Sequence, residues 1–180
     1  MKTLTLLRHA KSGWDDPVAR DFDRALNPRG MKGARTVGLH MRDLGLVFDH
    51  VISSPAVRCV DTLDGVWEGY GRVLHPVWDR RVYLASGATL LDVVHDAPDS
   101  ATRILMCGHN PGLEDLILML VAEGADNPLR DEVEEKFPTA SIAELQIDVA
   151  HWAEIKPNSA RLTRFIRPRD LDAALGPDDQ

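Results

Sequence analysis

The sequence is poor in cysteine. Only Cys59 and Cys107 occur among its 180 residues, and they are too far apart for a CxxC motif. Small secreted domains that depend on disulfides are rich in cysteine, so we expect two buried thiols instead. Neither cysteine begins a CxxxxxR loop, which excludes the phosphatases that use a cysteine nucleophile in that motif.

Long apolar runs are also missing. No stretch approaches the roughly 20 apolar residues that a membrane-spanning helix needs. The opening MKTLTLL resembles the start of a signal peptide, but Arg8, His9 and Lys11 interrupt it before an apolar region of about 7–15 residues can form. We therefore expect a cytoplasmic protein with no membrane partner.

Positive charge is in deficit, because 21 lysines and arginines face 28 aspartates and glutamates, for a net charge of −7. A general nucleic-acid binder needs a basic surface, so we expect no nucleic-acid partner. A small basic pocket would stand out against this background and attract an anionic ligand. The sequence also lacks a GxxxxGK[ST] nucleotide loop and a GxSxG nucleophile elbow.

The chain does contain a regular alternation of apolar segments. Its composition, 44% hydrophobic and 27% charged, is that of a globular protein. We expect one domain over residues 1–180, with a flexible polar tail from about residue 168 to 180. The expected strands are 3–7, 48–54, 73–79, 103–107, 143–149 and 161–166; the expected helices are 28–44, 55–70, 86–97 and 111–121; residues 124–138 are expected to be a charged loop. This order predicts an α/β fold with a mainly parallel sheet.

Unusual polar residues follow three of the expected strands. Arg8 and His9 end the first strand; the next two junctions supply Ser53, Ser54 and Arg58, and Gly108, His109 and Asn110. In open α/β sheets, ligands bind at the carboxyl ends of the strands. Arginine forks and helix N-termini both favour a phosphate, so phosphate or sulfate is the expected occupant of this edge.

Two histidines at such a site suggest chemistry as well as binding. Cations nearby lower the pKa of an imidazole, and a neutral imidazole is a nucleophile. One histidine would attack phosphorus while the other hydrogen-bonds the phosphoryl oxygens. Each of Arg8, His9, Arg58 and His109 alone is more often structural, so the hypothesis depends on their coincidence. The other five histidines show no HxH or HxxxH spacing and are interpreted as structural or surface residues.

Several segments together resemble the histidine phosphatase superfamily, whose hallmark is Arg-His-Gly at the end of the first strand. The segments LRHAKSGWDDP, DFDRALNPRG, RVYLAS, GHNPGLEDL and FPTAS are similar to those of its SixA-like phosphohistidine phosphatases. The resemblance extends to about RFIRPRDL, nearly the whole chain. Ala10 replaces the glycine of the wider superfamily, as it does elsewhere in the SixA-like group.

The resemblance implies a fold and a set of roles. The fold would be a three-layer α/β/α sandwich with a mostly parallel mixed sheet, phosphoglycerate mutase-like. His9 would be the nucleophile that becomes phosphorylated, and Arg8, Arg58 and His109 would bind and steady the phosphoryl group. No metal or organic cofactor would be needed, and water would hydrolyse the phosphoenzyme.

The resemblance leaves the general acid open. Relatives that hydrolyse phosphate esters carry a Glu or Asp after the second helix, where this chain has DRRVYLAS. Tyr83 falls near the place of that acid, and Asp79 is close by.

The lack of a clear general acid in the sequence leads to a hypothesis about the substrate. Esters expel an alkoxide, which needs an acid, whereas phosphohistidine expels an imidazole that solvent can protonate. We therefore expect a phosphorylated protein carrying phosphohistidine as the substrate. A phosphomonoesterase acting on a small phosphorylated substrate, or a non-catalytic phosphate-binding module, are the alternatives.

Overall fold

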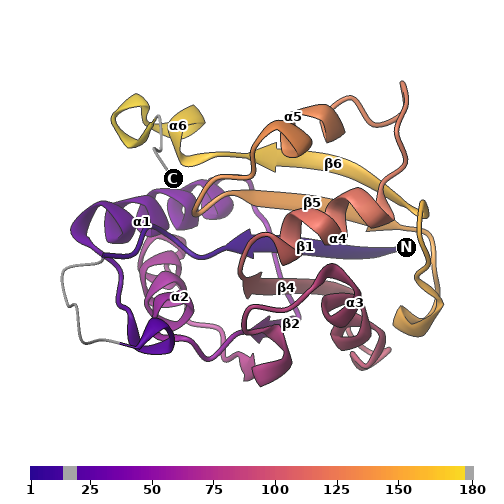
Figure 1. The fold of residues 1–180 in the computed structure, drawn as a ribbon, viewed down its shortest axis with the longest axis horizontal. Coiled ribbons are helices and arrows are strands. Elements are labelled where there is room, and N and C mark those ends of the chain that lie inside the picture. The colour runs from indigo at the N-terminus through magenta and orange to yellow at the C-terminus, as the bar shows by residue number, and fades with distance from the viewer. Residues whose placement is uncertain (14–19, 177–180) are drawn as a thin grey trace.

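The protein folds around a six-stranded mixed sheet (Figure 1). The structure is a computed structural model, and it describes residues 1–13 and 20–176. The strands lie in the order β3-β2-β4-β1-β5-β6. Their bounds are β1 Lys2–Arg8, β2 His50–Ser53, β3 Val77–Trp78, β4 Arg103–Gly108, β5 Ile142–Ile147 and β6 Ala160–Ile166.

Strand direction divides the sheet into two parts. Strands β3, β2, β4 and β1 are mutually parallel, whereas β5 is antiparallel to both of its neighbours, β1 and β6. The α/β architecture with a mostly parallel mixed sheet is therefore confirmed. β6 forms the outer edge of the antiparallel part, and its carboxyl end lies at the same sheet edge as that of β1.

Helices cover both faces of the sheet. Their bounds are α1 Pro28–Asp43, α2 Val57–Tyr70, α3 Gly87–His95, α4 Gly112–Leu120, α5 Arg130–Glu135 and α6 Pro168–Leu171, and short 3₁₀ helices are η1 Asp21–Asp23, η2 Arg80–Val82, η3 Trp152–Glu154 and η4 Ala173–Leu175. Figure 1 shows α1 and α2 together on the left and α3 and α4 on the right. No helix in the described ranges is long and apolar enough to cross a membrane.

Two hydrophobic clusters pack against the sheet, one on each face. Leu4 and Leu6 of β1 pack in one cluster with residues of α3 and α4, and Leu7 packs in the other with residues of α1 and α2. Burial of a leucine side chain is worth about 1.5–3 kcal/mol. β1 is thus held from both faces, up to the point where Arg8 and His9 end the strand.

Asn-Pro pairs mark the starts of two helices, α1 and α4. Asn27 caps α1 as expected, because its side chain accepts a hydrogen bond from the Gly30 amide, and Pro28 occupies the first turn. The Asn110-Pro111 pair also precedes a helix, but this helix begins one residue after the proline instead of at it. α4 begins at Gly112, and the Asn110 side chain accepts from the Glu114 amide at 3.2 Å.

The expectation that residues 124–138 form only a loop is wrong. Arg130–Glu135 form α5, a short helix that buries Val133 and most of Arg130. The Arg130 guanidinium donates to the carbonyls of Leu118 and Val121 at the end of α4, at 3.1 and 2.7 Å. A tertiary contact therefore stabilises this helix, whose single inward apolar residue leaves no visible periodicity in the sequence.

The carboxyl-terminal segment follows β6. Residues 168–171 form α6, which contacts α1, and Leu175 is 7% exposed. Residues 177–180 of the predicted tail lie outside the described residues, and the flexibility of the tail stays a prediction. Both cysteines are buried free thiols, as expected.

Candidate active site

The strand order brings the three predicted junctions together. β1, β4 and β2 are adjacent and parallel, so their carboxyl ends share one edge of the sheet. A cavity of about 310 Å³ opens there, called the site cavity below. It is lined by Arg8, His9, Ser12, Asp21, Arg24, Arg58, Leu84, His109, Asn110 and Thr139. The four residues predicted to bind or attack phosphate therefore line one cavity.

The imidazole of His9 is buried and oriented by the backbone. Its Nδ1 lies 2.7 Å from the Ala10 carbonyl oxygen, which can only accept, so Nδ1 carries the proton and Nε2 keeps its lone pair. Burial lowers the pKa of His9 to about 3; the bond to Ala10 opposes this shift, and the charges of His109, Arg8 and Arg58 add to it. At neutral pH, His9 is a neutral base with Nε2 as its basic nitrogen.

Hydrogen bonds also orient the ring of His109, but they leave an N–H group rather than a lone pair without a partner. Its Nε2 lies 2.8 Å from the Ser54 hydroxyl, and that hydroxyl accepts from the Ala56 amide at 3.2 Å. Ser54 is therefore best satisfied by donating to Nε2, which places the proton of a neutral His109 on Nδ1. Within the described chain, this buried Nδ1 has no hydrogen-bond partner. It is a donor suited to a ligand oxygen, and its ring lies 5.3 Å from that of His9.

Two arginines line the cavity with the histidines, Arg58 buried and Arg8 half-buried. Arg58 is 2% exposed, and its Nε has no hydrogen-bond partner among the described residues. Its two terminal nitrogens donate to the Asp21 carbonyl at 2.8 Å and to the Asp21 carboxylate at 3.0 Å. Arg8 donates to the Phe137 carbonyl at 3.0 Å. Guanidinium groups held in this way keep one orientation, and their remaining N–H groups, such as the Nε–H of Arg58, are donors suited to an oxyanion.

Asp21 is a site residue that the sequence interpretation missed. Its carboxylate accepts from the Tyr83 hydroxyl at 2.6 Å, from Arg58 at 3.0 Å and from Arg24 at 3.2 Å. Burial alone would raise the pKa of Asp21, but the bonds from Tyr83 and Arg58 outweigh it and lower the pKa to about 2. Asp21 lies in the family-like segment DFDRALNPRG, but nothing in the local pattern of that segment indicates that Asp21 contacts Arg58.

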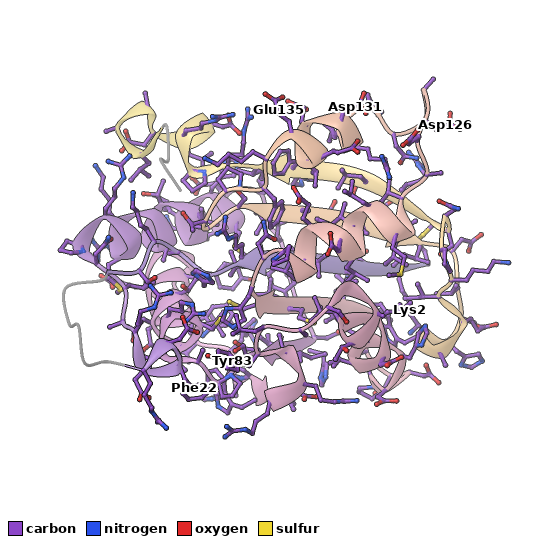
Figure 2. All side chains as sticks on the ribbon, in the orientation of Figure 1. Lys2, Phe22, Tyr83, Asp126, Asp131 and Glu135 are labelled. Atoms are coloured by element: carbon purple, nitrogen blue, oxygen red, sulfur yellow. The ribbon has the colours of Figure 1, made fainter. Side chains whose placement is uncertain are left out.

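Neither of the two residues considered as general acids is among the residues that line the site cavity. The Asp79 carboxylate is bound by Arg81, at distances from 2.8 to 3.3 Å, and Asp79 does not line the site cavity. Tyr83 stands closer, because its ring lies 5.4 Å from that of His109 and 5.1 Å from that of Phe22. Figure 2 shows Phe22 and Tyr83 next to each other.

The hydroxyl of Tyr83 is directed to Asp21. Burial and the bond to Asp21 raise the pKa of Tyr83, and the carboxylate partner of that bond is ionised at neutral pH. Neither member of the Tyr83–Asp21 pair is then a ready proton donor. Among the described residues that line it, the cavity holds strong cations and two imidazoles, but no carboxyl group that keeps a proton at neutral pH.

The state of His9 leads to a pH prediction. A lowered pKa means that the folded protein resists protonation of His9, so the ring stays neutral as pH falls from 8 to 5 and gains its proton only near pH 3. Two-dimensional nitrogen-15 NMR of the imidazole rings would show an Nδ1–H tautomer for His9 throughout this range. A midpoint near the ordinary value of about 6.5 would contradict the burial argument.

Comparisons with known proteins identify a family and several relatives. Residues 4–81 match the model of the histidine phosphatase superfamily (branch 1). An uncharacterised protein of Mycobacterium tuberculosis is 34% identical over 165 residues, covering 91% of this chain and all of that protein.

Two solved structures are similar over most of their length. The first, from Agrobacterium tumefaciens, carries the provisional name phosphohistidine phosphatase SixA. It is 29% identical, with a TM-score of 0.75, over 93% of this chain and 98% of its own. The second, with the same provisional name, is from Nakamurella multipartitia. It is 27% identical, with a TM-score of 0.80, over 93% of this chain and 96% of its own.

Proposed function

The chain belongs to the histidine phosphatase superfamily and to its SixA-like group, and we propose that it hydrolyses phosphohistidine carried on proteins. His9 is the nucleophile in this proposal. The observation that carries it is the neutral His9 imidazole, with Nδ1 held by the Ala10 carbonyl, in a cavity that it shares with the buried Arg58, the half-buried Arg8 and a second histidine.

The first half-reaction transfers the phosphoryl group. Nε2 of His9 attacks phosphorus, and the bond from phosphorus to the substrate imidazole breaks. Arg8, Arg58 and the Nδ1–H of His109 stabilise the charge on the phosphoryl oxygens, which is where it is concentrated in the transition state. The departing imidazole takes its proton from solvent, because its basic nitrogen needs no strong acid to leave near neutral pH.

The second half-reaction releases phosphate. Water attacks the phosphorus on His9, the bond from phosphorus to Nε2 breaks, and inorganic phosphate leaves. Nε2 regains its lone pair, and the bond from Nδ1 to the Ala10 carbonyl keeps the ring in place through both steps. This cycle uses side chains of the site cavity and water.

The state of the carboxylates supports phosphohistidine over esters. An ester must expel an alkoxide, and general acid catalysis of that step is worth roughly 10²–10⁴-fold. The Asp21 carboxyl, with a pKa of about 2, is ionised at neutral pH, and the Tyr83 hydroxyl is bound to it. A substrate whose leaving group departs without general acid catalysis therefore loses the least rate in such a cavity.

The test compares substrates on one preparation of the protein. We expect kcat/KM for a phosphohistidine peptide to exceed that for small phosphate esters by at least about 10²-fold, because the described lining residues include no protonated carboxyl group to act as the acid. Phosphate release would be followed for the peptide, for phosphoserine and for a sugar phosphate. A preference for either ester would replace the proposal with the phosphomonoesterase alternative.

A further inference from the structure

A second cavity opens beside the site cavity and is surrounded by cations. It lies between the segment after β1, the first turns of α1, the loop before β5 and the segment after β6. The cations that line it are Lys11, Arg29, Lys136, Arg167 and Arg169, and we call it the basic cavity. No aspartate or glutamate is among its described lining residues. In a chain of net charge −7, this is a local concentration of positive charge.

Two of these cations are poorly explained by the fold. Arg29 occupies the first turn of α1, where the helix dipole disfavours a positive side chain. Arg29 and Arg169 are both exposed, and neither forms a hydrogen bond or ion pair within the described part of the chain. Arg167, in contrast, is paired with Asp170 at 2.9 Å. Arg167 therefore has a direct carboxylate partner, whereas Arg29 and Arg169 have none within ion-pair distance among the described residues, although the charge of Arg169 helps to lower the pKa of Asp170.

The basic cavity adjoins the candidate nucleophile. Thr139 lines both cavities, and Ala10, whose carbonyl orients His9, lines the basic cavity. Gly30 lets α1 approach this segment closely, because a Cβ at that position would lie 2.1 Å from the Lys11 carbonyl oxygen. Because the two cavities share Thr139, a ligand that fills one cavity lies next to the opening of the other.

The two cavities differ in size. The basic cavity offers about 30 Å³, against about 310 Å³ in the site cavity. It has room for one small group such as a carboxylate, and its cations come from several segments around the opening. This shape suits an acidic side chain on an extended segment better than a whole small molecule.

We propose that the basic cavity binds an aspartate or glutamate side chain of the protein substrate, a few residues from the phosphohistidine held in the site cavity. This inference rests on the proposed function for its substrate. An extended peptide advances about 3.3 Å per residue, so a short segment spans two cavities that share Thr139. The cavity would thus select phosphohistidines that have acidic neighbours.

The test uses the double variant Arg29→Gln/Arg169→Gln, which removes two exposed charges and keeps most of each side-chain stem. The substrates are two phosphohistidine peptides of equal length, one with acidic and one with amide neighbours, and phosphoimidazole. We expect the wild type to prefer the acidic peptide by about tenfold at low salt, and the variant to lose most of this preference through a higher KM. Turnover of phosphoimidazole should stay unchanged.

A matched control removes two positive charges elsewhere. Lys156 and Arg161 are exposed and lie near the start of β6, whereas Arg167 and Arg169 of the basic cavity follow the opposite end of that strand. The variant Lys156→Gln/Arg161→Gln should keep the preference for the acidic peptide. An equal loss in the control would show that net charge, and not the basic cavity, attracts the peptide, and would overturn the inference.

A binding experiment separates this inference from the proposed function. The unphosphorylated acidic peptide, carrying a fluorophore, should bind the wild type in an anisotropy titration and bind Arg29→Gln/Arg169→Gln at least about fivefold more weakly. If phosphohistidine is not hydrolysed but this difference holds, the acidic subsite stands and the phosphatase proposal falls. Equal binding by both proteins, or full competition by inorganic phosphate at the peptide's own concentration, would overturn the acidic subsite.

Discussion

His9→Ala is expected to lower hydrolysis of a phosphohistidine peptide by at least about 10³-fold, because removal of a covalent nucleophile eliminates its whole reaction path. The same change should abolish an acid-labile phosphoryl adduct that the wild type forms when mixed with phosphoimidazole and quenched within seconds. Intact-protein mass spectrometry in alkaline solution would measure the adduct, and phosphate release would measure turnover.

The control for this prediction is His75→Ala. His75 is exposed and lies outside the site cavity, so its loss should leave both measurements within about twofold. A wild type that binds phosphate but never forms the adduct would favour the non-catalytic phosphate-binding module. Retention of the adduct in His9→Ala would mean that another residue is the nucleophile.

Arg58→Ala is expected to cost about 2–4 kcal/mol of transition-state stabilisation, or roughly 30- to 1,000-fold in kcat/KM. Arg58 is buried at the cavity wall, and its two bonds to Asp21 hold the guanidinium in one orientation. Arg58→Lys should recover only part of the loss, because an ammonium is a point charge without the planar fork. Steady-state kinetics on the phosphohistidine peptide would measure both variants.

Folding must be separated from catalysis in this case. Loss of Arg58 leaves the partly buried Asp21 carboxylate with Tyr83 and Arg24 as partners, so thermal unfolding should be followed alongside activity. Arg35→Ala, at an exposed position of α1, is the matched control and should retain full activity. If a folded Arg58→Ala protein kept wild-type kcat/KM, Arg58 would have no part in binding the phosphoryl group.

Much of the fold could be predicted because strong local signals agree with the tertiary structure. The run that ends at Arg8 is short and rich in leucine, and the strand that it forms is buried on both faces over most of its length; Asn27-Pro28 marks the start of α1. Weak or short patterns were less informative. α5 escaped notice because Arg130 is inside the protein, where it binds carbonyls at the end of α4.

Strong local signals also allowed part of the candidate site to be predicted. Arg8, His9 and His109 lie at the ends of buried strands, and Arg58 lies in the first turn of the helix after another such strand, so their position at a sheet edge can be inferred from the sequence. Asp21 could not be found in this way, because it lies in a polar segment with no strand before it. Its importance depends on a contact with Arg58, which is 37 residues away along the chain.

The sequence by itself determined which residues stand at the ends of the buried strands, since apolar periodicity and capping residues act over a few neighbouring positions. Only the tertiary structure decided that β2, β4 and β1 are adjacent, that Asp21 holds Arg58, and which nitrogen of each histidine carries the proton. These features depend on groups distant in the chain and on their exclusion from water. No local pattern encodes them, because hydrogen bonds and burial are set by the packed neighbours.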